Sequence, residues 1–355
     1  MAHLVAAPDK FRGTASSADV AAAVAAAAGA AGWTADAVAL SDGGEGFLHA
    51  LGGLPHHTRV DGPLGQPVDA EWRLLPSHPV TAVIEMARAA GRALVPHPRG
   101  DDPIRADTAG VGQLLLAAVE AGARRIVVGC GGSATTDGGW GAFRAVRNGA
   151  DASGSGEARG RNAPLHGIEL IAATDVSTPF LQAATVFGAQ KGATEPQIGA
   201  LTTRLRRVAD RYTKFTGLDV TTAPGAGAAG GLAGGLVALG GRIERGFALV
   251  AAMVDLPGRL ERADLVVTGE GYMDPLSFRG KVPGGVIDLA CRRLQGPVPV
   301  LCVVGGGDAS VLRVPPPSVE IVSLSHRFGT TRARHHTLPL VTEVVRERLR
   351  RTAGI

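Results

Sequence analysis

The chain has 355 residues, of which 45% are apolar and 19% are charged, so it is long enough for about two domains and can bury a large core. The net charge of +4 is modest and only 4% of residues are aromatic, which disfavours a nucleic-acid surface of clustered cations and stacking rings. The 51 glycines follow no three-residue period, so the chain is not collagen-like.

The first third predicts short strands and helices in alternation. Residues 4–7 and 35–40 form apolar runs typical of buried strands. Ser16 or Ser17 can cap a helix through residues 18–31, and a short helix is expected at 47–51. Met1–Ala6 shows no signal-peptide pattern, so we expect a cytoplasmic protein.

The middle of the chain differs in style. Alternating stretches at 68–75 and 80–86 predict a hairpin-like pair of strands. The further expected elements are a helix at 111–121, a strand at 126–128, a polar low-complexity loop at 151–163, a strand at 168–172 and a helix at 196–212. The uncharged stretch 223–241 is too rich in glycine to span a membrane.

The last third returns to alternation. Strands are expected at 265–267, 298–304 and 321–324, and helices at 286–294 and 339–351. Short apolar strands alternating with helices favour an α/β fold with a parallel sheet covered on both faces. We therefore expect a discontinuous α/β domain made of 1–62 plus 260–355, with 63–259 inserted as a second α/β domain.

Five glycine-rich turns follow or adjoin apolar strands. They are Ser41–Gly46, Gly129–Gly139, Gly225–Gly235, Thr268–Gly271 and Gly305–Asp308. Successive free N–H groups in such turns bind anions, and ligands of open α/β sheets lie beyond the carboxyl ends of strands. The carboxylates of Asp42, Glu45, Asp137, Glu270 and Asp274 stand in or beside three of the turns, a combination that indicates a Mg-nucleotide.

Common motifs of other classes are absent or weak. Gly225–Gly230 matches G-x-G-x-x-G, but no strong strand precedes it, so close packing of a helix over 228–239 near a ligand fits better than a dinucleotide site. No P-loop and no protein-kinase motif set occurs. Cys130, Cys291 and Cys302 lack metal-ligand spacing and are expected to be buried free thiols.

Ten segments carry a resemblance to a known family. They are Ala7–Gly13, Asp42–Gly46, Gly62–Gly65, Ile84–Ala87, Gly131–Gly139, Thr174–Val176, Phe187–Ala193, Pro224–Gly231, Thr268–Asp274 and Gly280–Pro283. In this order the chain resembles the bacterial glycerate kinase family often called type I. The resemblance implies a flavodoxin-like parallel-sheet domain and a second domain similar to a restriction-enzyme-like fold. It also implies phosphorylation of D-glycerate by ATP, usually at the 2-hydroxyl, in a cleft between the domains.

Residue types within these segments suggest roles. Arg12, Lys191 and Lys281 are expected to neutralise the γ-phosphate or the acceptor anion, and Asp137 or Asp274 to act as the base. Lys191 and Lys281 are two of only four lysines, with Lys10 and Lys214, among 36 basic residues, so a chemical role is favoured for both. Mg²⁺ is expected on some of Asp42, Glu45, Asp175 and Glu270. Contacts to ATP or acceptor are expected from Asp9, Lys10, Gly43, Gly44, Gly131, Gly132, Ser133, Gly225, Gly227, Gly269 and Gly271.

Five positions depart from the usual family residues. Arg12, Phe47, Gln113, Thr136 and Leu276 stand where Lys, Thr, Glu, Asn and Gln are common. Lost polar groups beside a site change selectivity, so a glycerate-like acceptor such as a hydroxyalkyl phosphonate stays open as an alternative. A non-catalytic nucleotide-binding protein is a further alternative. The expected partners are a small hydroxy acid and ATP, without nucleic acid or membrane, and a homodimer is an open possibility.

Overall fold

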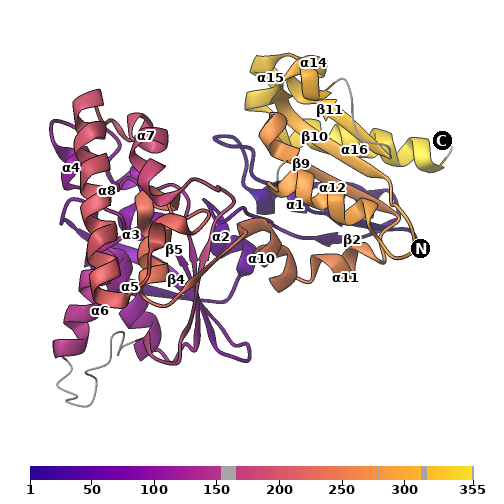
Figure 1. Ribbon diagram of the computed structural model, residues 1–355. Coiled ribbons are helices and arrows are strands. Elements are labelled where there is room, and N and C mark those ends of the chain that lie inside the picture. The colour runs from indigo at the N-terminus through magenta and orange to yellow at the C-terminus, as the bar shows by residue number, and fades with distance from the viewer. Residues whose placement is uncertain (153–164, 279, 313–317, 354–355) are drawn as a thin grey trace. The chain divides into compact units, whose positions relative to one another are not determined.

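The computed structural model describes residues 1–152, 165–278, 280–312 and 318–353. The chain divides into two compact units (Figure 1). Unit 1 comprises Met1–Asp42, His49–Leu51 and Phe247–Ile355, and unit 2 comprises Gly43–Leu48 and Gly52–Gly246.

Unit 1 is built on a five-stranded parallel sheet in the order β11-β10-β9-β1-β2. Its strands are β1 (His3–Ala6), β2 (Thr34–Ala37), β9 (Leu265–Met273), β10 (Val300–Gly307) and β11 (Val319–Ser323). Counted within the unit, the order is 2-1-3-4-5, which is the flavodoxin-like arrangement. The α/β fold class expected from the alternation of strands and helices is confirmed.

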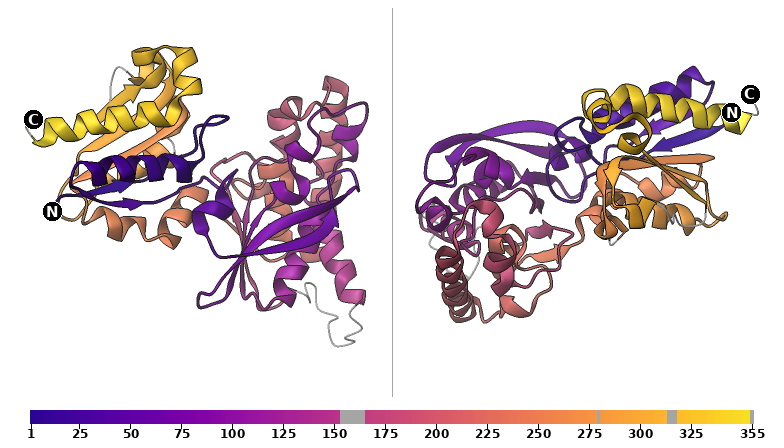
Figure 2. Two further views of the ribbon diagram at one scale, coloured as in Figure 1. Left: turned by 180° about the vertical axis from the view of Figure 1, so that it is seen from behind. Right: turned by 90° about the horizontal axis from the view of Figure 1, so that it is seen from above.

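Helices cover both faces of this sheet. The helix α1 (Ser17–Ala30) begins at a capping box, in which Ser16 Oγ accepts from Asp19 N at 3.1 Å and the Asp19 carboxylate accepts from Ser16 N. It packs with α16 (Thr337–Ala353) on one face, where Val24 and Val345 share a core with strand residues such as Val267 (Figure 2, right). The other helical elements are α10 (Gly246–Met253), α11 (Leu256–Leu260), η7 (Pro275–Phe278), α12 (Val282–Cys291), α13 (Ala309–Leu312), α14 (Leu324–Phe328) and α15 (Thr330–His335).

Unit 2 is built on a six-stranded mixed sheet in the order β3-β4-β5-β6-β7-β8. Its strands are β3 (Leu54–Asp61), β4 (Pro67–Leu75), β5 (Thr81–Glu85), β6 (Arg125–Gly129), β7 (Glu169–Ala173) and β8 (Arg242–Glu244). The expected pair at 68–75 and 80–86 is present as the antiparallel pair β4–β5, and the strands from β5 to β8 are parallel. Because β3 pairs with β4 along its whole length, residues 54–61 lie in unit 2 and not with 1–62, whereas 247–259 lie in unit 1.

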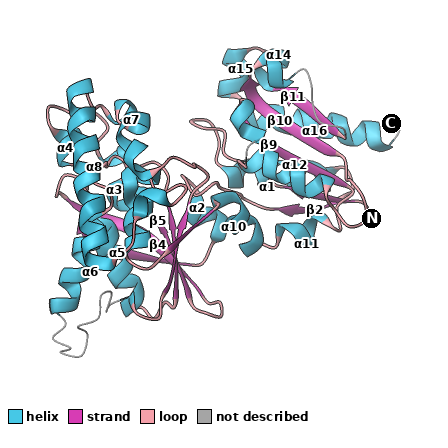
Figure 3. Cartoon of the chain, in the orientation of Figure 1, coloured by secondary structure: helices cyan, strands magenta, loops and turns pink. Residues whose placement is uncertain are grey.

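Helices pack around the sheet of unit 2 (Figure 3), and large apolar side chains form its core. Trp72, Phe143 and Tyr212 are almost fully buried in one cluster. The helical elements are α2 (Phe47–Leu51, shared between the units), α3 (Ala87–Ala90), η1 (Arg92–Leu94), α4 (Asp102–Arg105), α5 (Ala109–Glu120), α6 (Trp140–Ala152), η3 (Phe180–Gln182), α7 (Ala183–Phe187), η4 (Ala189–Lys191), α8 (Glu195–Thr216), η5 (Val220–Thr222), η6 (Ala228–Gly231) and α9 (Leu232–Ala238).

Several expected boundaries move for local reasons. The helix expected at 286–294 begins at Val282, because Lys281 is its N-cap and Pro283 suits the first turn. The helix expected over 228–239 is split, because Ala229 and Gly230 have left-handed backbones. Most of the expected loop at 151–163 lies outside the described residues. Within those residues, no helix is both long and apolar enough to cross a membrane.

Candidate active site

A cavity of about 840 Å³ in unit 1 lies at the carboxyl ends of the sheet strands. The loop after β1 supplies Asp9 to Thr14, the end of β9 supplies Glu270 to Tyr272, and the end of β10 supplies Gly305 to Gly307. The strand order reverses at β1, because β2 lies on one side of it and β9 on the other, so the cavity includes the position where flavodoxin-like folds bind their ligands. A nucleotide-sized ligand fits within such a volume.

Glycines at the ends of β9 and β10 let main-chain atoms form part of the cavity surface. A Cβ atom at Gly305 would lie 2.5 Å from the carbonyl oxygen of Gly271, so the ends of β9 and β10 can approach only without a side chain there. At Gly269 a Cβ atom would lie 1.8 Å from Val303 O. Strand β9 therefore continues to Met273, six residues beyond the strand expected at 265–267.

Carboxyl groups gather in this cavity. Burial is the main reason that the pKa of Glu270 is raised to about 7. The charges of Asp9 and Asp274 also act to raise this pKa, whereas Ser277 and Lys281 act to lower it. Burial raises the pKa of Asp9 to about 6; Lys10 opposes this shift and Asp42 adds to it. Glu270 Oε1 is buried and accepts no hydrogen bond from the described residues. These carboxyl groups therefore suit a bound cation.

Cations line the same cavity. Lys10 Nζ lies 3.8 Å from Asp9 Oδ1, and Lys281 Nζ lies 3.7 Å from Asp274 Oδ1. The exposed side chain of Arg12 is part of the lining. The arrangement combines side chains that can donate to phosphate oxygens with carboxylates that can bind a metal.

Asp274 is fixed by the turn that follows β9. Its Oδ1 accepts hydrogen bonds from Leu276 N at 2.8 Å and Ser277 N at 3.0 Å. The side chain remains about one third exposed and lines the cavity. It is therefore oriented by the backbone and open to a ligand.

Asp137 has the opposite environment. It is fully buried in unit 2, and its two oxygens accept hydrogen bonds from Thr108 N, Thr108 Oγ1, Gly139 N and Gly141 N at 2.8 to 3.1 Å. Four donors occupy the carboxylate, and no surface reaches it. Asp137 therefore holds the 131–139 loop against the start of α5 and α6, and this environment argues against its expected role as base.

Lys191 lies beside that loop. It is 7% exposed, and its Nζ donates to Thr135 O at 2.5 Å and contacts Thr136 Oγ1 at 3.4 Å. Burial lowers the pKa of Lys191 to about 7; Asp137 opposes this shift and Arg92 adds to it. A buried amine with these neighbours can change its charge near neutral pH.

The structure brings eight of the expected site residues into the unit 1 cavity. These are Asp9, Lys10, Arg12, Asp42, Glu270, Gly271, Asp274 and Lys281. Of the remaining expected site residues, Gly269 lies in unit 1 outside the cavity lining, and all others lie in unit 2. These are Gly43, Gly44, Glu45, Gly131, Gly132, Ser133, Asp137, Asp175, Lys191, Gly225 and Gly227. The four expected metal ligands are thus divided between the units, with Asp42 and Glu270 in unit 1.

Packing explains several unit 2 glycines without a ligand. Cβ atoms at Gly43, Gly225 and Gly227 would lie 2.6, 2.9 and 2.4 Å from backbone oxygens. The G-x-G-x-x-G segment thus packs against residues 176–179, which agrees with the weak dinucleotide signal. Ser133 Oγ bonds within its own loop, to Thr135.

The departures from the family pattern have different surroundings. Phe47 is fully buried in the core, and Gln113 exchanges hydrogen bonds with Asp61 at 2.7 Å. Neither residue lines a described cavity. Arg12 lines the unit 1 cavity, and Thr136 contacts Lys191.

Other lining residues escaped the sequence reading. Tyr272, Ser325, Thr330, Arg334 and Thr337 complete the cavity wall. Ser325 follows β11, so the rule on strand ends could have found it. The helical residues from 330 to 337 belong to no glycine-rich motif, and only the tertiary fold brings them to the cavity.

Within the described part of the chain, protein side chains alone do not form a metal site. The described residues contain no group of three His, Cys, Asp or Glu side chains that could hold a metal ion. Mg²⁺ bound with a nucleotide needs only one or two carboxylates plus phosphate oxygens, so Glu270 with Asp9 or Asp42 fits that chemistry.

Comparisons with known proteins agree with this geometry. The sequence model of the "Glycerate kinase family" matches residues 4–337 of this chain. The chain is 37% identical over 284 residues to the glycerate 2-kinase of Escherichia coli K12, covering 74% of each protein. It is 37% identical over 289 residues to a glycerate kinase of Bacillus subtilis 168, covering 75% of this chain and 74% of the relative.

A solved structure extends the similarity to the fold. The crystal structure of "putative glycerate kinase 2" from Salmonella typhimurium LT2 superposes with a TM-score of 0.77 at 32% identity, covering 100% of this chain and 99% of that one. Similarity in sequence and in fold spans both units. The chain therefore belongs to the glycerate kinase family and is a small-molecule kinase.

Proposed function

We propose that the protein transfers the γ-phosphoryl group of ATP to a hydroxyl of a small hydroxy acid, with D-glycerate as acceptor and 2-phosphoglycerate as product. The observation that carries this proposal is the unit 1 cavity, where glycine-rich strand ends, four cations and several carboxylates meet. The named activities of the E. coli and B. subtilis relatives support the choice of acceptor.

In this proposal the unit 1 cavity takes the nucleotide. Lys10, Arg12 and Lys281 face the phosphates and neutralise charge that develops on the transferred group. Glu270, with Asp9 or Asp42, would hold Mg²⁺, and the ion would supply charge neutralisation for the phosphates. The buried and unpartnered Oε1 of Glu270 supports that assignment.

Asp274 is the proposed base. Its carboxylate is oriented by two backbone N–H groups, lines the cavity and lies 3.7 Å from Lys281. A group that accepts the acceptor's proton must reach the substrate, and Asp137 has no exposed surface with which to do so. Asp274 accordingly accepts the hydroxyl proton as the acceptor oxygen bonds to the γ-phosphorus and ADP leaves, and Lys281 neutralises charge on the transferred group.

The test is release of ADP with Mg-ATP and a panel of hydroxy acids, followed by identification of the phosphorylated carbon. D-glycerate should be the preferred acceptor, and Asp274→Asn should lower kcat by about 100-fold or more. Asp288→Asn removes an exposed carboxylate on α12 and serves as the matched control. Absence of turnover with every acceptor in the wild-type protein would contradict the proposal.

The same chemistry on a hydroxyalkyl phosphonate is the second candidate. It is favoured by Arg12 and Thr136, since these departures touch a cavity wall and a buried lysine. A higher kcat/KM for the phosphonate than for D-glycerate in the same panel would select it.

A further inference from the structure

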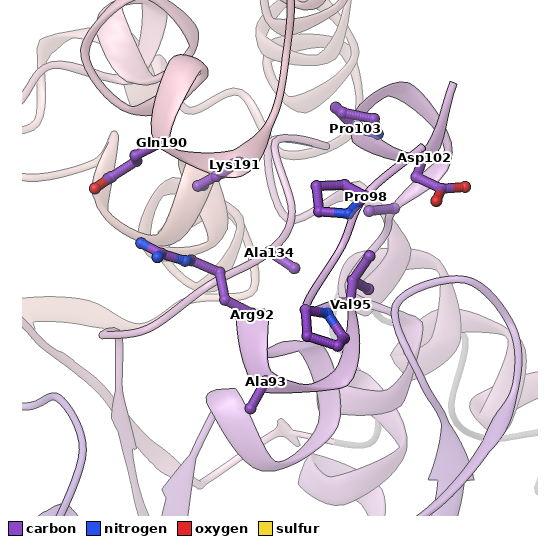
Figure 4. A pocket seen from close by; sticks show the side chains of 11 residues that line it. Arg92, Ala93, Val95, Pro98, Asp102, Pro103, Ala134, Gln190 and Lys191 are labelled. Atoms are coloured by element: carbon purple, nitrogen blue, oxygen red, sulfur yellow. The ribbon is translucent and has the colours of Figure 1, made fainter. Parts of the chain in front are cut away.

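A second and smaller cavity lies in unit 2. Its volume is about 290 Å³, and its wall combines two cations with an apolar side (Figure 4). Arg92 comes from η1, Lys191 from η4, and Val95, Pro96 and Pro98 from the segment that follows η1. The sequence does not predict a role for Arg92, because this residue follows the Ile84–Ala87 segment and belongs to no motif.

Arg92 and Lys191 both line the cavity, and the Lys191 amine also donates to Thr135 O. Figure 4 shows the Arg92 guanidinium reaching the side of the cavity where Gln190 and Lys191 lie. Arg92 is close enough to lower the pKa of Lys191 by repulsion. Among the described residues, its guanidinium forms no side-chain hydrogen bond and no ion pair.

The acidic residue of this wall does not neutralise them. Asp102 lies on the other side of the cavity in Figure 4, and its Oδ2 accepts a hydrogen bond from Arg99 N at 2.9 Å. Asp137 attracts Lys191 from beneath, but its oxygens are taken by Thr108 and by the loop N–H groups. The positive charge at this cavity therefore comes mainly from Arg92, because Asp137 partly compensates Lys191.

The size of the cavity limits its ligand. Ligand cavities usually measure about 300–1,000 Å³, so this one suits a molecule of a few heavy atoms and is too small for a nucleotide. The prolines and Val95 offer an apolar wall to a short carbon chain. A small organic anion combines both properties.

We propose that the unit 2 cavity binds the acidic end of the acceptor, with Arg92 and Lys191 as the residues that hold its carboxylate. The identity of the acceptor as a hydroxy acid rests on the proposed function, whereas the anion site rests on the cavity itself. Gln190 lies on the same side. The apolar wall covers the carbon chain.

A proton movement follows from this arrangement. The charged groups around Lys191 are Asp137 in the 131–139 loop, Arg92 in η1 and Asp102 in α4. Without a ligand the amine is about half protonated near pH 7. A bound carboxylate stabilises the ammonium form, so the protein takes up a proton from the buffer when the anion binds at pH 8.

Steady-state kinetics test the first part. Arg92→Met should raise KM for D-glycerate by about 10- to 100-fold, because it removes a charge-assisted hydrogen bond, and leave KM for ATP within about twofold. Arg99→Met removes an exposed cation from the same segment, outside the cavity wall, and should leave both values unchanged. A KM for D-glycerate in Arg92→Met equal to that in Arg99→Met would overturn the proposal.

Calorimetry without ATP separates this site from the proposed function. D-glycerate titrated at pH 8 in Tris and in HEPES should bind with uptake of a proton, and Lys191→Met should lose that uptake. Binding that Arg92→Met abolishes, in a protein with no turnover, would support the site and reject the proposed function. Turnover of D-glycerate by the wild type, together with unchanged D-glycerate binding in Arg92→Met, would support the proposed function and reject the anion site. An Arg92-dependent KM for 2-hydroxyethylphosphonate but not for D-glycerate would overturn the assignment to a carboxylate.

Discussion

Replacing Asp137 by Asn should destabilise unit 2, because the buried carboxylate has no neutral equivalent in its site. Oδ2 accepts from Thr108 N at 3.1 Å, Thr108 Oγ1 at 2.8 Å and Gly141 N at 2.9 Å, and Oδ1 accepts from Gly139 N at 3.0 Å. An Asn side chain has one acceptor oxygen and one NH₂ group. If the oxygen keeps the three donors around Oδ2, the NH₂ group faces the Gly139 N–H.

The expected loss can be worked from these contacts. A buried N–H left without an acceptor costs about 1–3 kcal/mol. The three remaining hydrogen bonds change from charge-assisted to neutral and lose about 1 kcal/mol each. The lower cost of burying an amide offsets part of this sum. We expect the free energy of unfolding of unit 2 to fall by about 2–4 kcal/mol.

Urea unfolding followed by tryptophan fluorescence measures this change. In a Trp33→Phe background, the remaining tryptophans, Trp72 and Trp140, both report on unit 2. Asp210→Asn alters an exposed aspartate on α8 and should change stability by less than about 0.5 kcal/mol. A loss in Asp137→Asn no larger than this control would refute the reasoning.

Three further outcomes follow from the structure. Burial lowers the pKa of Lys191 from 10.5 to about 7, so between these pH values the unfolded chain binds a proton that the folded chain lacks. The free energy of unfolding should therefore rise with pH over this range. Urea midpoints at pH 7.5 and 9.5 should show this rise in the wild type and a smaller one in Lys191→Met. Chelation by EDTA should stop ADP release, and added Mg²⁺ should restore it. Glu270→Gln should raise the Mg²⁺ concentration for half-maximal activity by about tenfold or more, whereas the exposed control Glu343→Gln should leave it unchanged. Equal Mg²⁺ requirements in both variants would show that Glu270 is not part of the metal site. Lys281→Met should lower kcat by at least about 10-fold if it contacts the transferred group, and a rate equal to the wild type would exclude that contact.

Local pattern explains the parts of the fold that the sequence predicts well. The capping box at Ser16 and the apolar runs around Leu4 and Val127 depend on neighbouring residues, so helix α1 and strands β1 and β6 lie close to their expected positions. The end of β9 was missed because Gly269 and Gly271 read as a turn. In the sheet, Gly269 instead permits close approach to Val303.

The candidate site divides in the same way. Motif residues at strand ends, such as Asp9 and Glu270, share one cavity because parallel strands end at one edge of the sheet. Burial has no local signature, so Asp137 reads like a catalytic carboxylate although four donors surround it. Arg92 and Arg334 reach their cavities only through tertiary packing, and no sequence spacing announces either residue.

The pairing of β1 with β9 has a consequence for the order of biosynthesis. His3 N donates to Asp264, 261 positions later in the chain, at the start of this pair. At about 5–20 residues per second, a ribosome needs about 13–52 s to supply that partner. The inserted unit 2 has emerged in full before then, whereas the first apolar strand and the alanine-rich α1 must wait without their sheet. The nascent N-terminal segment is therefore the part of this chain on which holding chaperones have the longest time to act.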